Sequence, residues 1–553
     1  MTDVRLSVVV PARNSGPWIA ELIESVLGQG DLGLELIVVD NGSTDGTTEI
    51  VRAVAARDSR VRLVTSSASS AAAARNDGVA HANGTYLVFA DSDDLVPEGA
   101  YREMLGSLEA SGSDMVIADH LKFSATRTWR PTERWYSFDE RRVGLVPGAV
   151  PELLSSRPCW NRMFHRAFWD HAGLRFPEID SVEDIEPMTR AFVSAEKLDV
   201  VPSCVYLYRE RADASSLSLR ADATVTTRYL EQELACARLV QHDTALRTAH
   251  AEIVLDADGW AHLHRFLLTA PAPDQVAPVA RATEALLEAI PLDGLTGVAP
   301  IRHMLWALVM QGDWTAATAF VIGSTSAHAE DRLDAWINAV VLLLATDPLI
   351  ATDLATGGLV PALVNGADGV GEAWLADRLG PVSHTEFRPT GSALSDAMIA
   401  AVRSGSPAAV RTASALRHLV PLVIDHVDVS DAGIVVGGPA DLSAFEGGVA
   451  LQLAGPSRQE VSTTPAPATG GWRSSVRAEE YAEGRYSVSV SFDGVDGSFP
   501  VVTARMPLPP VGPGMPMQPL ADRKDGWRFL VDRRPTREGG VRGLLRRAAG
   551  RFR

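Results

Sequence analysis

The sequence predicts an α/β domain built on a parallel sheet, followed by an α-helical linker domain and a C-terminal β-sandwich. Over residues 1–120, short apolar runs rich in Val, Ile and Leu alternate with stretches of helical periodicity, as in a parallel sheet covered by helices. Residues 222–416 are rich in Ala and Leu with helical periodicity. From Pro421 onward, runs that alternate apolar and polar residues are separated by Gly and Asp turns, which favours a small β-sandwich.

The chain length and composition predict a folded protein of several domains. A chain of 553 residues is too long for one hydrophobic core. Its 46% hydrophobic and 22% charged residues are typical of folded proteins. We expect the α/β domain at 1–220, the helical domain at 221–416, the β-sandwich at 417–506, and a Pro/Gly linker with a basic tail at 507–553.

The charge and the cysteines exclude several classes of protein. A formal net charge of −18 argues against nucleic acid as the main partner. The three cysteines, Cys159, Cys204 and Cys236, show no CxxC spacing. We therefore expect neither a disulfide framework nor a zinc site, as in a reducing cytosol.

The chain shows no sequence signal for export or membrane insertion. The N-terminus MTDVRLSVVVPARN carries Asp3 and Arg5 early, and its apolar run is too short for a signal peptide. A membrane helix needs about 18 to 20 apolar residues. The longest candidate, AWINAVVLLLATDPLI, is interrupted by Asn338, Asp347 and Pro348. We expect a soluble, cytoplasmic protein.

The elements of the α/β domain follow one another in a regular order. We expect strands at 6–12, 34–40, 60–66, 86–89 and in SDMVIADH, and helices at 18–29, 44–56, 71–82 and in the segment before SDMVIADH. Residues 121–215 are less regular and rich in aromatic residues, with a short helix in SVEDIEPMTRAF and then a strand and loop in VVPSCVYLYRERADASSLS. In a parallel sheet, ligands bind beyond the carboxyl ends of the strands.

A cluster of carboxylates follows one predicted strand, in the segment FADSDDL. Asp91, Asp93 and Asp94 lie within four positions, so their charges repel one another and raise one another's pKa. One interpretation is a solvated turn with helix-capping aspartates. The other is a site for Mg²⁺ or Mn²⁺, which prefer hard oxygen ligands. Because Asn14 and Asp40 also lie at strand ends, we expect the three loops to share one crevice.

These motifs resemble a known family of enzymes. The segments VVVPARNSGPWIAELIESVLGQ, ELIVVDNGSTDGT and AAARNDGVAHANGTYLVFADSDD, in this order over about 100 residues, resemble the family 2 glycosyltransferases with a GT-A fold. PCWNRMFHR, FPEIDSVEDIEPMTRAF and YLYRERADASSLS resemble the segments that complete this domain in bacterial enzymes that decorate cell-wall or capsular polymers. The order of the three parts is similar to that of wall teichoic acid glycosyltransferases.

The resemblance implies a nucleotide-sugar site. The nucleotide-binding residues it implies are Pro11, Ala12, Arg13, Asn14, Asp40, Asn41, Arg75, Asn76, Asp91 and Ser92. Among them, Asp40 would accept hydrogen bonds from uracil, although it is also a plain turn former. Arg75 and Asn76 would face the diphosphate or ribose, although Arg75 could be a solvated arginine.

The resemblance also implies roles for the acidic residues. Asp93 would ligate Mn²⁺ or Mg²⁺ directly, and Asp91 would contact the ribose and the water molecules of the metal. Asp94 would bind a sugar hydroxyl or serve as a structural cap. In SVEDIEP, Asp184 would be the catalytic base, and Glu183 would hold sugar or acceptor hydroxyls. The alternative for this pair is an acidic first turn stabilised by the helix dipole.

A basic segment and an aromatic residue complete the predicted sugar and acceptor site. Arg209, Arg211, Ser215 and Ser216 can bind phosphate, either on the donor or on an anionic acceptor, or they form a solvated loop. Trp160 and Asn161 would line the sugar or acceptor site, although Trp160 could equally belong to the core. His120, His165 and His171 show no HxxxH or HExxH pattern, so a structural role is favoured.

The sequence thus predicts a metal-dependent, inverting glycosyltransferase that moves a sugar from a UDP-sugar to a cell-surface polymer or its lipid-linked precursor. A nucleotidyltransferase is a second interpretation, but PARNSGPWI is a poor match to the Gly-rich basic loop of that class. A third is a catalytically degenerate scaffold that binds the polymer. The helical domain would supply packing or homo-oligomer contacts, and the β-sandwich a self-association surface or a glycan-binding face.

The C-terminal tail has eight arginines between Arg533 and Arg553. It could form an amphipathic helix at the inner face of an anionic membrane, bind a polyanionic acceptor, or remain a solvated end.

Overall fold

The computed structural model describes residues 4–67, 70–133, 138–211, 221–440, 442, 448–456, 458–466, 471–493, 495–503, 515–520 and 527–531. The chain divides into two compact units, residues 1–322 and 323–553. The predicted site residues Ser215 and Ser216 and the basic tail lie outside the described residues. Apart from the C-terminal end of the β region, the domain boundaries expected from the sequence stay a prediction.

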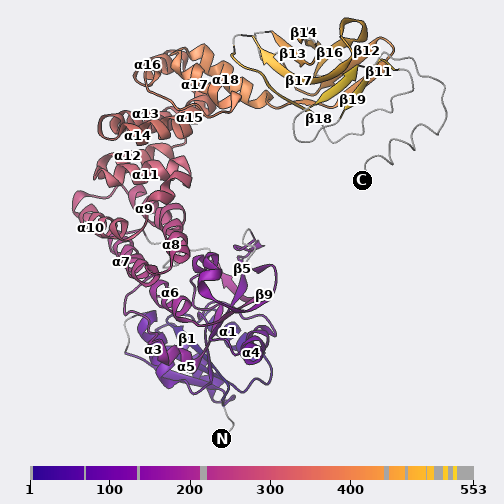
Figure 1. Ribbon diagram of the computed structural model, residues 1–553. Coiled ribbons are helices and arrows are strands. Elements are labelled where there is room, and N and C mark those ends of the chain that lie inside the picture. The colour runs from indigo at the N-terminus through magenta and orange to yellow at the C-terminus, as the bar shows by residue number, and fades with distance from the viewer. Residues whose placement is uncertain are drawn as a thin grey trace, which may run out of the picture. The chain divides into compact units, whose positions relative to one another are not determined.

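A single sheet organises the N-terminal α/β region (Figure 1). Its strands run in the order β3-β2-β1-β4-β8-β5-β9-β7, with β6 paired to β5. The strands are β1 (Leu6–Ala12), β2 (Leu34–Asp40), β3 (Val61–Thr65), β4 (Tyr86–Phe89), β5 (Met115–Phe123), β6 (Thr128–Trp129), β7 (Arg142–Leu145), β8 (Arg162–His165) and β9 (Leu198–Arg209). Every residue of β1 and β2 is buried, which is why both read as continuous apolar runs.

The sheet is mixed, whereas the β-α alternation predicted a parallel one. Strands β1 to β4 are parallel, but β8 lies between β4 and β5 and is antiparallel to both. β7 is likewise antiparallel to β9. Between β5 and β8 the described chain forms short strands and the 3-10 turns η2 (Pro147–Ala149) and η3 (Pro151–Ser155), so β8 enters the sheet from the opposite end.

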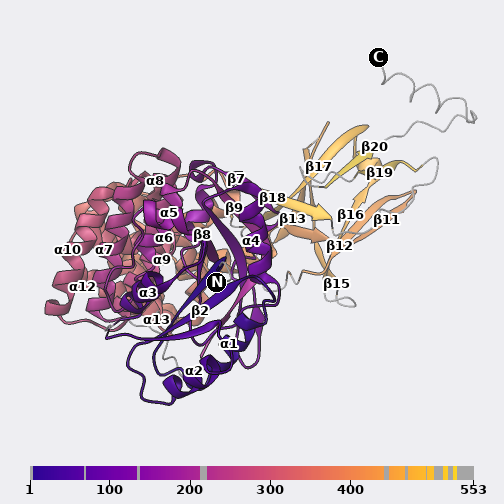
Figure 2. The same cartoon turned by 90° about the horizontal axis from the view of Figure 1, so that it is seen from below.

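Helices cover both faces of the sheet. The helices here are α1 (Ile19–Leu27), α2 (Thr47–Ala55), α3 (Ala71–His81), α4 (Ala100–Ser111), α5 (Arg166–His171) and α6 (Ile185–Ser194). In β2, Leu36 and Val38 belong to the large core that also holds residues of α1 and α2, whereas Ile37 and Val39 pack against Ala74 of α3. Figure 2 shows α3 on one side of β2 and α1 and α2 on the other.

Helix α3 approaches the sheet closely at Gly78. A Cβ atom at this position would lie 2.4 Å from a Cγ atom of Val9 and 3.1 Å from one of Val39. Only glycine therefore lets α3 pack at this depth. The same helix carries Arg75 and Asn76, so this packing fixes where the two side chains can reach.

The rest of the first unit is helical. It contains α7 (Ala223–Val240), α8 (Thr244–Asp256), α9 (Asp258–Leu268), α10 (Pro273–Ala289) and α11 (Pro300–Met310), and α12 (Trp314–Ser324) runs past its end. Arg157 joins this region to the α/β region, because its guanidinium donates two hydrogen bonds of 2.8 Å to Glu233 of α7. Both side chains are buried, and His250 of α8 lies 2.9 Å from the same carboxylate.

The second unit contains helices and then two β-sheets. The helices are α13 (Ala329–Thr346), α14 (Pro348–Leu354), α15 (Val360–Gly366), α16 (Glu372–Ser383), α17 (Ala393–Arg403) and α18 (Pro407–Leu419). The smaller sheet holds β11 (His426–Ser430), β12 (Gly433–Gly438), β15 (Thr464–Ala466) and β16 (Gly471–Arg477). The larger holds β10 (Leu422–Ile424), β13 (Val449–Ala454), β14 (Arg458–Ser462), β17 (Gly484–Phe492), β18 (Phe499–Thr503), β19 (Met517–Leu520) and β20 (Arg528–Val531).

The two sheets share one hydrophobic core, which includes Val436 and Trp472 from the smaller sheet and Leu451 and Val490 from the larger. Strands β19 and β20 extend the β region beyond residue 506, where the sequence predicted only linker and tail. The sequence did not indicate these strands, because the segment is rich in proline and β19 is short and contains Pro519.

One helical stretch, Pro348–Gly369, is long and apolar enough to cross a membrane by length and composition, and 44% of its apolar window is buried. A packed core helix passes the same criterion, so this single stretch is weak evidence for a membrane span. No other helix of the described residues meets it.

Candidate active site

The strand order reverses beside β1, and this places the candidate site. From β1 the chain moves to β2 and β3 on one side and then crosses to β4 on the other. The loops after β1, β2 and β4 therefore meet at one edge, where α/β sheets bind ligands.

Hydrogen bonds join these three loops directly. The backbone N–H of Asn14 donates to Ser43 Oγ at 3.0 Å, and the backbone N–H of Thr44 donates to Asn14 Oδ1 at 2.9 Å. Ser15 Oγ lies 2.5 Å from Ser92 Oγ of the loop after β4. Asn14 has a φ of 52°, a conformation that asparagine tolerates better than most residues. The loops thus form one connected rim.

The predicted nucleotide residues after β1 and β2 differ in exposure. Pro11 and Ala12 are buried at the end of β1, whereas Arg13 is exposed at the rim. Asp40 is 4% exposed, and its carboxylate accepts hydrogen bonds from the Ser43 N–H at 3.3 Å and the Thr48 hydroxyl at 2.9 Å. Asp40 therefore shapes the turn, as one interpretation of DNGSTDG expected. Asn41 is buried beside it, and its N–H donates to Ala12.

A buried arginine joins the two acidic motifs. Arg75 donates to Asp91 Oδ1 at 2.7 Å and to Glu183 Oε1 at 2.6 Å. Its side chain is 7% exposed, and its guanidinium lies 5.4 Å from the centre of the Phe176 ring. The alternative of a solvated arginine is wrong, because the Arg75 side chain is buried and paired.

Asn76 does not face the crevice as the resemblance implied. Its amide nitrogen donates to the Phe176 carbonyl at 2.8 Å, and its oxygen accepts from the Phe176 N–H at 3.0 Å. Both polar ends of the side chain are satisfied by one backbone residue. Asn76 therefore anchors the segment that leads to Glu183 and Asp184.

Two arginines, one at the end of β9 and one just beyond it, contact Asp93. Arg211 Nε lies 3.1 Å from Asp93 Oδ2, and Arg209 Nε donates to the Asp93 carbonyl at 2.7 Å. Burial and the neighbouring Asp91 raise the pKa of Asp93, and the arginines oppose this. Carboxylate oxygens are hard ligands, and a divalent cation can bind them and balance their negative charge. In the structure Arg211 supplies that charge.

Asp94 turns away from the crevice. It is 1% exposed, and its Oδ1 accepts a hydrogen bond of 2.6 Å from the Arg209 backbone N–H. Leu95 and Leu207 then pair through two backbone hydrogen bonds of 3.1 and 2.9 Å. Of the two roles expected for Asp94, the geometry favours the structural one, because this carboxylate holds the DSDDL turn against β9.

One group of three metal-ligand side chains was found among the described residues, and it lies outside the crevice. The ligand atoms of Glu233, Cys236 and His250 lie within 4.8 Å of one another. Arg157 already binds both oxygens of Glu233, so the protein itself supplies the positive charge there.

Glu183 and Asp184 follow a strained residue. Val182 has a φ of 56°, which β-branched residues rarely adopt and which is typical of functional sites. Asp184 occupies the N-cap position of α6, but its side chain makes no capping hydrogen bond. Asp184 therefore does not act as a hydrogen-bonding cap of α6, and the alternative of an acidic first turn stabilised by the helix dipole stays open. Burial and the charge of Glu183 raise the pKa of Asp184 to about 7, against the opposing effect of Arg75.

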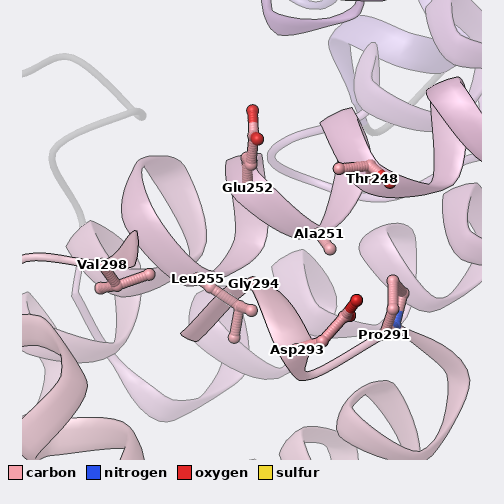
Figure 3. Close-up of a pocket in the computed structure, with 8 residues that line it drawn as sticks. All are labelled: Thr248, Ala251, Glu252, Leu255, Pro291, Asp293, Gly294 and Val298. Atoms are coloured by element: carbon pink, nitrogen blue, oxygen red, sulfur yellow. The ribbon is translucent and has the colours of Figure 1, made fainter. Parts of the chain in front are cut away.

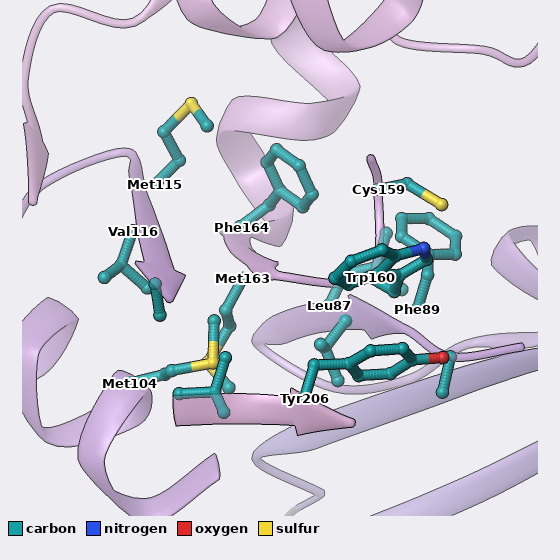
Figure 4. Close-up of a cluster of buried hydrophobic side chains, with 14 of the residues drawn as sticks. Leu87, Phe89, Met104, Met115, Val116, Cys159, Trp160, Met163, Phe164 and Tyr206 are labelled. Atoms are coloured by element: carbon teal, nitrogen blue, oxygen red, sulfur yellow. The ribbon is translucent and has the colours of Figure 1, made fainter. Parts of the chain in front are cut away.

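Trp160 and Asn161 belong to the packed interior. Trp160 is 7% exposed, and its ring centroid lies 4.3 Å from that of Tyr206. Figure 4 shows the two rings stacked on each other. Asn161 is fully buried, and its amide donates to the Ala118 carbonyl at 2.9 Å. The expectation that Asn161 lines the sugar site is therefore wrong. Trp160 supports the site indirectly, because the Tyr206 hydroxyl accepts a hydrogen bond of 2.8 Å from the Asp91 N–H.

Sequence reasoning missed several residues that build the site. Ser15, Tyr206 and Arg162 lie outside the predicted set, yet Ser15 joins two loops and Tyr206 holds Asp91. Arg162 is fully buried, and burial lowers its pKa to about 9, although the charge of Asp184 opposes this shift. A lone serine, tyrosine or arginine in a strand carries no pattern that could have revealed these roles.

The pocket in Figure 3 lies elsewhere. It has a volume of about 130 Å³ and is lined by Thr248, Ala251, Glu252, Leu255, Pro291, Asp293, Gly294 and Val298 of the helical region. Ligand sites typically have volumes of about 300 to 1,000 Å³. We therefore assign no ligand to it.

Comparison with known proteins identifies the family. Residues 7–170 match Glycosyl transferase family 2. The glycosyltransferase GlyG of Streptococcus pneumoniae serotype 4 is 36% identical over 219 residues, which cover 37% of this chain and 71% of GlyG. The succinoglycan biosynthesis protein ExoO of Rhizobium meliloti is 30% identical over 231 residues, covering 39% of this chain and 64% of ExoO. The chain thus spans about two thirds of the length of these relatives.

A solved structure aligns over a larger share of the chain. S. aureus TarS 1–349 in complex with UDP aligns with a TM-score of 0.48 and 18% sequence identity, covering 58% of this chain and 90% of that chain. The described architecture is the GT-A α/β domain with a helical region and a C-terminal β-rich region, as the sequence predicted. By the family match and the likeness to GlyG, this chain belongs to glycosyl transferase family 2.

Proposed function

We propose that this protein is an inverting glycosyltransferase that moves a sugar from a UDP-sugar to a cell-surface polymer or its lipid-linked precursor. One observation carries the proposal: Arg75 contacts Asp91 at 2.7 Å and Glu183 at 2.6 Å. The strand-end motif and the acidic pair are far apart in sequence, yet they meet on one guanidinium. A donor that is bound beside Asp91 would therefore also lie beside Asp184, the predicted base.

In this proposal, Asp184 removes the proton from the acceptor hydroxyl. The acceptor oxygen then forms a bond to C1 of the sugar, the bond from C1 to the diphosphate oxygen breaks, and UDP leaves with the electron pair. A pKa of about 7 leaves a large share of Asp184 ionised at neutral pH and keeps it basic enough to accept a proton. Glu183, held by Arg75, is in position to orient a sugar or acceptor hydroxyl.

The donor would lie over the rim formed by the loops after β1, β2 and β4. Asp40 would accept hydrogen bonds from uracil, and the exposed Arg13 and Asn14 would contact the nucleotide. Asp93 and Asp91 would hold Mn²⁺ or Mg²⁺. When bound, the cation would neutralise the negative charge that develops on the leaving diphosphate.

The acceptor and the cellular place are further parts of the proposal. The name of ExoO, a succinoglycan biosynthesis protein, supports a polysaccharide acceptor. Arg209 and Arg211 lie at the crevice and would favour an anionic one. We place the enzyme in the cytoplasm, with the arginine-rich tail at the inner membrane face, and its helical or β regions in contact with a second copy.

A donor screen tests the proposal. Purified protein with a bacterial cell-wall polymer extract would be supplied with UDP-, GDP- and dTDP-linked sugars, and release of the nucleoside diphosphate would be measured. We expect release from UDP-sugars. Asp184→Asn should lower the rate by about 10²- to 10⁴-fold, the usual contribution of a general base, and leave UDP affinity unchanged.

Asp180→Asn is the matched control, because Asp180 lies four residues upstream, is 60% exposed and pairs with Arg228. It should keep the wild-type rate. Equal rates for Asp184→Asn and the wild type would refute the role of Asp184. Polymer synthesis in cells that is unchanged by Asp184→Asn would favour the scaffold interpretation instead.

A further inference from the structure

Arg211 occupies the carboxylate that the proposal assigns to a metal ion. Its Nε lies 3.1 Å from Asp93 Oδ2, and its guanidinium lies 5.5 Å from the centre of the Trp18 ring. The two side chains are 28% and 21% exposed, so solvent screens the pair only in part. The contact therefore satisfies Asp93 with a charge from the protein itself.

Arg209 makes a different set of contacts, although it lies only two residues away. Its Nε donates to the Asp93 main-chain carbonyl at 2.7 Å, and its Nη2 donates to Glu21 at 2.7 Å. Its guanidinium also lies 4.7 Å from the centre of the Phe123 ring. Arg209 thus holds the backbone of the turn, whereas Arg211 holds the carboxylate.

The carboxylate of Asp93 needs a positive partner. It lies two residues from Asp91, and the two negative charges repel each other. Arg75 is committed to Asp91 and Glu183, and Arg209 to Glu21. Of the arginines described at this edge, Arg211 is the one whose side chain pairs with the Asp93 carboxylate.

We propose that Arg211 is a built-in counter-ion of Asp93, that Mn²⁺ must displace it to reach the carboxylate, and that the displaced guanidinium then binds the donor diphosphate. This inference rests on the proposed function, because it concerns the same site. One side chain would thus oppose binding of the metal alone and favour binding of the metal with nucleotide. The bare metal would bind weakly, and the nucleotide would complete the site.

The test measures binding rather than turnover. Titrations with Mn²⁺ alone, followed by the electron paramagnetic resonance signal of the unbound ion, would compare the wild type with Arg211→Gln. We expect the variant to bind Mn²⁺ about tenfold more tightly, a change equal to about 1.4 kcal/mol. In saturating Mn²⁺, calorimetry with UDP should show about tenfold weaker binding to the variant, because a charge-assisted hydrogen bond is lost.

Two further variants separate the carboxylate contact from general effects. Arg211→Lys keeps the positive charge and should keep the weak Mn²⁺ binding of the wild type. Arg209→Gln removes a neighbouring charge that does not touch the carboxylate, so it should raise Mn²⁺ affinity less than Arg211→Gln does. Circular dichroism and thermal melts establish that each variant is folded.

The inference predicts two changes of opposite sign in Arg211→Gln, namely tighter binding of Mn²⁺ and weaker binding of UDP. Unchanged or weaker Mn²⁺ binding by folded Arg211→Gln would overturn it, as would Mn²⁺ binding by Arg211→Lys as tight as that of Arg211→Gln. Unchanged UDP affinity would also overturn it. If the wild type releases UDP from a UDP-sugar but these shifts are missing, only this inference falls. If the shifts appear but no donor is consumed, the proposed function falls instead.

Discussion

The raised pKa of Asp184 predicts that the catalytic base lowers the stability of the fold. Burial and the charge of Glu183 raise the pKa from 3.8 to about 7, with a smaller contribution from Asp91 and opposition from Arg75. The native state therefore holds a proton that the unfolded chain has released. Stability from this residue is complete below about pH 3.8 and is lost as the pH rises through about 7.

The size of this loss follows from the two pKa values. Each pH unit between them costs about 1.4 kcal/mol, which sets an upper limit of about 4 kcal/mol for the wild type above pH 7. Because the Asp184 side chain is partly exposed to solvent, we expect about half of this limit. Asp184→Asn should therefore be more stable than the wild type at pH 8.5 by about 2 kcal/mol, and the difference should be smaller at pH 5.

Urea unfolding at the two pH values measures this difference, with Asp180→Asn as the control that should show no pH-dependent change. The same pKa should appear in activity: kcat/KM should rise with pH, reach half its maximum near pH 7 and stay level above it. A stability difference between Asp184→Asn and the wild type that is equal at pH 5 and pH 8.5 would refute the reasoning. So would an activity profile with its midpoint near 4.

Two further substitutions test residues that support the site. Asn76→Ala should lower the free energy of unfolding by about 1 to 3 kcal/mol, because the Phe176 backbone loses two hydrogen bonds. UDP affinity should not change. A large loss of UDP affinity in a variant of wild-type stability would instead support a nucleotide-binding role for Asn76. Arg157→Met should cost about 3 to 5 kcal/mol in urea unfolding, because the fully buried Glu233 loses the guanidinium that binds both of its oxygens. A loss below about 1 kcal/mol would contradict this account.

The sequence predicted the structure best where a regular pattern of apolar residues is followed by a motif of polar residues. The strands at Leu6–Ala12 and Leu34–Asp40 were predictable because each is buried on both faces and reads as a continuous apolar run. The loops beyond them were predictable as a shared rim because parallel strands end at the same edge. The antiparallel strand β8 was not, because Arg162–His165 has only four residues, of which just Met163 and Phe164 are apolar, and it is buried by the strands that pair with it on both sides.

The same limit applies to the site residues. A motif shows which residue types are present, but it does not show where their side chains point. Asn76 follows Arg75 on α3, yet one anchors the Phe176 backbone and the other joins two carboxylates. Asp93 and Asp94 are adjacent, yet one meets Arg211 and the other the β9 backbone. These differences depend on contacts with residues 100 or more positions away in sequence, which a single sequence does not reveal.

A crystal structure of the protein with a bound UDP-sugar and Mn²⁺ would test the central claim most directly. The account predicts uracil beside Asp40, the diphosphate beside Asp93 with Arg211 moved onto it, and C1 of the sugar facing Asp184 across the space for an acceptor hydroxyl. A nucleotide bound away from the loops after β1, β2 and β4, or a sugar whose C1 faces away from Asp184, would contradict it.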